Sequence, residues 1–135
     1  MPRRREPKWL DRIVLDAVHF DLLRTFGGLA GIRDENALES ALARPRHRWV
    51  YAKQHGLATL AAAYGFGIAR SHPYRDGNKR LAFMAMAIFL GLNGYEIDAP
   101  EEDVVSLMTS LAAGSTSEAS LSKWLRARSV ALRKA

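Results

Sequence analysis

The run HPYRDGNKR, residues 72–80, combines residue types that can bind and transfer a phosphate group. It places a histidine, an acid, a glycine, an amide and two adjacent cations directly before a long apolar segment. If that segment is a helix, its first N–H groups have no helical partners and carry a partial positive charge, which attracts anions. The pattern predicts a phosphate site at a helix start near residues 77–80. A polar turn between two core helices is the alternative.

The residues at the predicted helix start suit a phosphate in different ways. Gly77 lets the backbone approach a ligand closely, and Asn78 can donate amide hydrogens. Lys79 supplies a point charge, whereas Arg80 supplies a bidentate fork. Together they fit the several phosphates of a nucleoside triphosphate.

Two further residues of the run add reactive chemistry. Asp76 can bind a divalent cation, because Mg²⁺ usually takes one or two protein carboxylates together with phosphates and water. Histidine titrates near neutral pH, so His72 can act as the general base that removes a proton from an attacking hydroxyl. A helix-capping histidine is the alternative for His72.

Helices must position this run, because apolar residues recur at helical spacing on both sides of it. Asp34 is predicted to be the N-cap of the second helix, and Ser117 or a neighbour that of the last. Pro45 is predicted to end the second helix. The segment after the run is apolar on every side of a helical wheel, which predicts a central position in the fold. The sequence predicts six helices and almost no sheet, with helices over residues 10–26, 35–43, 57–71, 80–93, 101–114 and 117–135.

Two stretches carry predictions of a different kind. Gly65 and Gly67 interrupt an alanine-rich helix at a cost of about 1 kcal/mol each, which indicates that a neighbouring backbone packs unusually close. Residues 46–56 have no helical period and contain residues that favour extended structure, so we expect a loop or a small hairpin there. This segment contains His47, Arg48 and His55.

Composition limits the class of protein. The 135 residues are 48% hydrophobic, enough for one buried core, and none is a cysteine. No segment looks like an export leader or a membrane span, so we expect a soluble cytoplasmic protein. The formal charge of +6 is concentrated in residues 1–8 and 123–135, and solvated ends explain it without nucleic-acid binding. We predict one all-α domain over residues 1–135 with a basic N-terminal arm, 1–8.

The run HPYRDGNKR resembles the signature of the Fic/Doc (Fido) family, and its NKR ending is similar to the death-on-curing (Doc) toxins. The larger Fic nucleotidyltransferases instead continue with a second glycine. Residues 26–45, FGGLAGIRDENALESALARP, and residues 89–97, FLGLNGYEI, also look like segments of Doc toxins. The resemblance covers about residues 10–130, and it implies a compact bundle of about six helices around a buried central helix.

The resemblance also implies roles for the residues of the run. His72 would be the general base toward a protein hydroxyl, and Asp76 would hold Mg²⁺. The phosphates of ATP would be held by the residues of the helix start, namely Gly77, Asn78, Lys79 and Arg80.

Lys79 decides which reaction is expected. In the nucleotidylating relatives a glycine at this place leaves backbone amides open to the α-phosphate, whereas a lysine adds bulk and charge. Doc toxins that this sequence resembles move the γ-phosphate of ATP to a threonine of elongation factor Tu and so arrest translation. We therefore rank a protein kinase above a protein adenylyltransferase.

The resemblance further implies a partner. Many Fic proteins carry their own inhibitory helix, with Ser or Thr four residues before a Glu, but Gly31 stands at that spacing before Glu35. A toxin without its own inhibitor implies a cognate antitoxin of the Phd type, which docks an amphipathic helix in a groove. A hypothesis of another class remains open, namely a catalytically inactive binding module or a DNA-associated regulator.

Three residues near the run have their own expectations. Tyr74 replaces the usual Phe of the family, so its ring should anchor the loop in the core and its hydroxyl should lie near solvent or a ligand. Arg75 should face solvent. His19 lies on the first periodic helix and is predicted to be a satisfied structural histidine.

Overall fold

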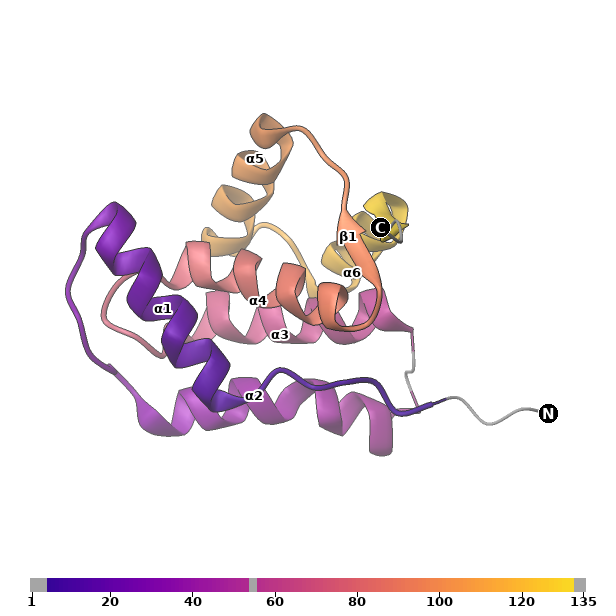
Figure 1. The fold of residues 1–135 in the computed structure, drawn as a ribbon, viewed down its shortest axis with the longest axis horizontal. Helices are drawn as coiled ribbons and strands as arrows, with labels where there is room; N and C mark the ends of the chain where they lie inside the picture. The colour runs from indigo at the N-terminus through magenta and orange to yellow at the C-terminus, as the bar shows by residue number, and fades with distance from the viewer. Residues whose placement is uncertain (1–4, 54–55, 133–135) are drawn as a thin grey trace.

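The computed structural model describes residues 5–53 and 56–132 and confirms the all-α class (Figure 1). Six helices and a two-stranded antiparallel sheet make up this part of the chain. Their order is α1 (Arg12–Phe26), α2 (Glu35–Val50), α3 (Leu57–Ser71), α4 (Asn78–Leu92), β1 (Tyr95–Ile97), α5 (Glu101–Ala112), α6 (Glu118–Arg128) and β2 (Ser129–Ala131).

Helices α3 and α4 form the centre of the bundle. Figure 1 shows them running side by side, with α2 below and α5 above. Gly67 lies against α2, since an added Cβ would sit 3.4 Å from the Cα of Ala41, which confirms the predicted close backbone approach. Gly65 instead makes room for a side chain, because a Cβ there would lie 2.3 Å from Met86 Sδ on α4. The glycines thus allow α3 to pack tightly against two neighbours.

The predicted end of the second helix is wrong. The N-cap is Asp34, as predicted, with its carboxylate accepting the N–H of Ala37 at 3.0 Å. However, α2 continues through the buried Pro45 to Val50. A proline inside a helix costs about 3 kcal/mol, and tertiary contacts beyond it offset this cost.

Those tertiary contacts explain why no loop or hairpin forms directly after Pro45. Trp49 packs against the core, and Arg48 bonds to Glu118 on α6. The segment predicted as extended therefore begins with the last turns of α2, where His47 and Arg48 lie. The described part of 46–56 leaves the helix only after Val50, and His55 lies outside the described residues.

The end of the chain also differs from the prediction. Ser117 caps α6 as predicted, but the helix ends at Arg128 and does not reach residue 135. Residues 129–131 form β2, which pairs antiparallel with β1. The segment after α4 contains β1, which supplies the edge for this pairing. In the described part of the chain no helix is long and apolar enough to cross a membrane.

Candidate active site

The run HPYRDGNKR connects the two central helices, α3 and α4, and this confirms the predicted position of the run directly before the central helix. Helix α3 ends at Ser71, and His72 follows in the left-handed conformation with φ of 48°. Gly77 is the N-cap of α4 with φ of 79°, and no side chain caps the first turn of α4. The motif loop, residues 72–77, therefore has a strained residue at one end and an open helix N-terminus at the other.

A second loop lies along the motif loop and holds it in place. This α1–α2 loop, residues 27–34, lies at the same end of the bundle in Figure 1. The backbone N–H groups of Arg33 and Asp34 donate to the carbonyl of Pro73 at 2.8 and 3.1 Å. In the other direction, the N–H of Arg75 donates to the carbonyl of Gly31 at 3.0 Å. The two loops thus form a short antiparallel pair.

Asp76 is fixed through both its backbone and its side chain. Its Oδ2 accepts the N–H of Leu29 at 2.7 Å, and its carbonyl accepts Nε2–H of His19 at 2.8 Å. His19 is 5% exposed, which confirms the predicted structural histidine, although its contact with the motif was not foreseen. Gly28 is required beside it, because an added Cβ would lie 3.1 Å from Asp76 Cβ.

Tyr74 anchors the loop as predicted, but its hydroxyl is neither at solvent nor free for a ligand. The buried ring stacks on His19 with centroids 3.8 Å apart. The hydroxyl donates to Asp16 Oδ1 on α1. Burial and this hydrogen bond raise the pKa of the Tyr74 hydroxyl, so it remains protonated. The role of Tyr74 is therefore to tie the loop to α1.

Asn78 also serves the loop. Its side chain is 8% exposed, with Oδ1 accepting the N–H of Tyr74 at 3.0 Å and Nδ2 donating to the Tyr74 carbonyl at 2.8 Å. Oδ1 and one of the two Nδ2 hydrogens are thus engaged within the loop, which leaves one amide hydrogen for the predicted contact with phosphate. Asn78 also offers an anion its backbone N–H in the first turn of α4.

The remaining residues of the run are open. The side chains of His72, Lys79 and Arg80 are exposed, and the His72 imidazole has no hydrogen-bond partner among residues 5–53 and 56–132. The Arg80 guanidinium lies 4.1 Å from the centroid of the Phe26 ring. Arg75 is exposed as expected. A base and two cations therefore flank the motif loop with groups available to a ligand.

The chain supplies few ligands for a metal. Within the described residues no group of three or more His, Cys, Asp or Glu side chains could hold an ion. Asp76 offers one carboxylate, and only Oδ2 is engaged in a hydrogen bond there. A single carboxylate fits Mg²⁺ that is held mainly by phosphates and water, and it does not fit an all-protein cage.

Fold and loop together define a small helical domain in which an uncapped helix start and two exposed cations follow the loop between the two central helices. The family model of the Fic/DOC family matches residues 9–90, and the chain belongs to this family. "Protein kinase doc" of Escherichia phage P1 is 33% identical over 113 residues, which cover 83% of this chain and 88% of that protein. "Toxin Doc" of Mycolicibacterium smegmatis is 41% identical over 76 residues, 55% of this chain and 58% of that protein. The resemblance seen in the motif is therefore confirmed.

Proposed function

We propose that the chain is a toxin of the Doc type, a protein kinase that transfers the γ-phosphate of ATP to a hydroxyl of elongation factor Tu. The observation that carries the proposal is the motif loop, which has an exposed His72 at one end and, at the other, an uncapped helix start followed by the exposed Lys79 and Arg80. The names of the two relatives, a protein kinase and a toxin, support the same class.

In the proposed reaction His72 takes the proton of the attacking hydroxyl. The hydroxyl oxygen forms a bond to the γ-phosphorus, the bond from that phosphorus to the β–γ bridging oxygen breaks, and ADP leaves with the electron pair. Because the imidazole makes no hydrogen bond within the described chain, a ring nitrogen can accept the proton without losing another contact.

The start of α4 performs the electrostatic part of the reaction. Its unpaired N–H groups, the Lys79 ammonium and the Arg80 guanidinium attract the phosphates and stabilise negative charge. Mg²⁺ at Asp76, when bound, would neutralise part of the phosphate charge. Gly77 has a left-handed backbone that permits the close approach of a phosphate.

Transfer of AMP in place of phosphate is the competing reaction, and isotope position separates the two. Purified protein with Mg²⁺ and γ-labelled ATP is expected to label elongation factor Tu, whereas α-labelled ATP should not. Label from the α-position would identify an adenylyltransferase. Growth arrest that persists in His72→Ala without any labelling would favour the inactive binding module or regulator.

We also propose a partner, a cognate antitoxin of the Phd type, for the groove beside the motif. The groove has a volume of about 460 Å³, and Lys79 and Arg80 are among the residues that line it, so a helix seated in it would cover the proposed phosphate site. Its lining is mostly apolar and carries two cations against one acid, Glu101, which suits an amphipathic helix with acidic residues. The apolar lining comes from α1, α4 and α5 and includes Leu22, Phe26, Phe83, Val104, Val105 and Met108.

Co-expression with the product of the adjacent reading frame tests the partner. Val105→Glu, at a side chain that is 57% exposed, should weaken co-purification while leaving labelling by the free protein unchanged. Ile13→Glu is the matched control, because Ile13 is an exposed residue of α1 that does not line the groove. Equal loss in both variants would contradict docking in this groove.

A further inference from the structure

The backbone of His72 is held in a conformation that non-glycine residues rarely adopt. Its φ and ψ are 48° and 61°, in the left-handed region, which costs an ordinary side chain about 1 kcal/mol. The next residue, Pro73, is fixed in its own φ and cannot donate a hydrogen bond. Contacts from outside the loop must therefore stabilise this geometry.

Arg33 provides those contacts. Its Nε donates to the carbonyl of His72 and its Nη2 donates to the carbonyl of Ser71, both at 2.6 Å. These are the last carbonyls of α3, where the helix carries partial negative charge, so the two bonds are charge-assisted. Within the described residues Arg33 forms no ion pair with a carboxylate. The hydrogen bonds that the guanidinium makes within the described residues both go to the end of α3.

The backbone of Arg33 extends the same contact. Its N–H donates to the carbonyl of Pro73 at 2.8 Å, so one residue binds three consecutive carbonyls. The following residue, Asp34, donates to Pro73 as well and caps α2. Because α2 packs extensively on α3, the position of Arg33 is set by a rigid element.

We propose that Arg33 is a positioning residue for His72. By holding the carbonyls on both sides of the His72 Cα, it fixes the left-handed turn and aims the imidazole at the hydroxyl of the substrate. Arg33 does not touch the reacting atoms. The role in turnover rests on the proposed kinase function, whereas the effect on His72 geometry does not.

The experiment compares Arg33→Ala and Arg33→Lys with the control Arg126→Ala. Arg126 is an exposed arginine on α6 whose nearest polar contact is Ser122 at 3.5 Å. Arg33→Ala should lower kcat by roughly 10-fold to 100-fold, because small misplacement of a reacting group has effects of this size, while KM for ATP changes by less than about 3-fold. Arg33→Lys, which keeps one cationic donor, should recover part of kcat. The control should match the parent protein.

A second readout does not depend on catalysis. The ring and amide resonances of His72, assigned in NMR spectra with the aid of His72→Gln, should shift in Arg33→Ala and stay unchanged in Arg126→Ala. If neither the parent protein nor any variant transfers phosphate, the proposed function fails. The NMR spectra alone then test whether Arg33 positions His72. Unshifted His72 resonances, or an unchanged kcat in an active protein, would overturn it. Should Arg33→Ala not fold, Arg33→Lys is read against the same criteria.

Discussion

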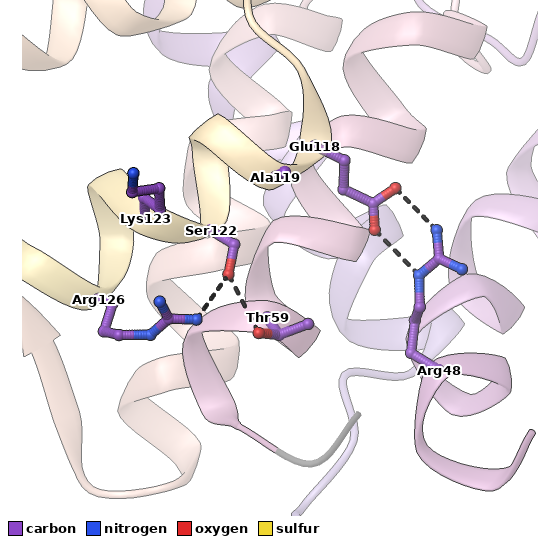
Figure 2. A pocket seen from close by; sticks show the side chains of 7 residues that line it. All are labelled: Arg48, Thr59, Glu118, Ala119, Ser122, Lys123 and Arg126. Atoms are coloured by element: carbon purple, nitrogen blue, oxygen red, sulfur yellow. Dashed lines mark hydrogen bonds and ion pairs between the residues drawn. The ribbon is translucent and has the colours of Figure 1, made fainter. Parts of the chain in front are cut away.

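Two polar regions of the molecule contain similar residue types but differ in role: in one the charged groups pair with each other, and in the other they remain exposed. Glu118, in the first turn of α6, accepts hydrogen bonds from Arg48 on α2 at 3.0 and 3.1 Å (Figure 2). It also accepts hydrogen bonds from Arg44 at 2.5 and 3.2 Å. Its carboxylate is 18% exposed, and both oxygens are engaged. In the motif loop and the first turn of α4, His72 and Lys79 are exposed with no such partner in the described chain.

Cavity size does not separate the two regions. The pocket beside Glu118 has a volume of about 510 Å³, and the groove beside Lys79 and Arg80 has about 460 Å³. The two regions differ in whether their polar groups have partners. The Glu118 cluster, which consists of Arg44, Arg48 and Glu118, is paired internally and links α2 to α6. The motif loop uses its polar groups in two ways, with some fixing the loop and others left open to a ligand.

The largest effect is expected from His72→Ala. Loss of a general base typically costs about 10²-fold to 10⁴-fold in rate, so labelling of elongation factor Tu should fall below detection. The free energy of unfolding should change by less than about 0.5 kcal/mol, because the side chain is exposed and unpartnered. The rate of labelling tests the expected loss of activity, and urea unfolding tests the expected unchanged free energy of unfolding. A large loss of stability would show that His72 belongs with the structural cluster.

The converse result is expected from Glu118→Ala. Removing the carboxylate leaves two guanidinium groups partly buried against each other, which should lower the free energy of unfolding by about 1–2 kcal/mol. Labelling per folded molecule should stay unchanged. Glu102→Ala is the control, since Glu102 is an exposed acid of α5. Activity that falls in proportion to stability at saturating ATP would contradict the separation of the two regions.

Gly28→Ala should have a smaller effect that is confined to the motif loop. An added Cβ would lie 3.1 Å from both Asp76 Cβ and Leu23 Cδ2 and 3.4 Å from Asp76 Oδ2, so two of its three nearest atoms belong to Asp76. The Mg²⁺ concentration for half-maximal labelling should therefore rise by roughly 10-fold, about 1.4 kcal/mol. Gly27→Ala is the matched control, because Gly27 also has a positive φ but has nothing within 4 Å of an added Cβ. Equal shifts in both variants would mean that backbone strain, and not contact with Asp76, is responsible.

How much of each region could be predicted from the sequence depended on how far apart in the chain its contacting residues are. The motif loop lies where a local pattern placed it, between two apolar helices, and Asp34 and Ser117 cap helices as short-range rules predict. Arg33 was missed because the carbonyls it binds lie 38 and 39 residues away, and nothing near it in the chain marks them. The Asp76 contact of His19 spans 57 residues.

The same reasoning explains the error at Pro45. A proline ends most helices because it removes an N–H and crowds the preceding turn. Here α2 continues because Arg48 reaches Glu118, which is 70 residues further along the chain. The Glu118 cluster therefore stabilises the fold and also helps to explain why the rule that a proline ends a helix fails at Pro45.

The smallest expected effect is on the pH dependence of stability, to which the Glu118 cluster should contribute. Burial alone would raise the pKa of Glu118, but hydrogen bonds from Arg48 and Arg44 outweigh it and lower the pKa below the usual 4.5. A lowered pKa in the folded state means that the ion pairs stabilise the protein above pH 4.5, and that this stability is lost as the pH falls through the folded pKa. The difference in unfolding free energy between the parent and Glu118→Gln should therefore be full at pH 7 and shrink by pH 3. Urea unfolding at both values measures it, and Glu102→Gln should show no such change. A difference that stays constant with pH would mean that packing, and not charge, is what Glu118 contributes.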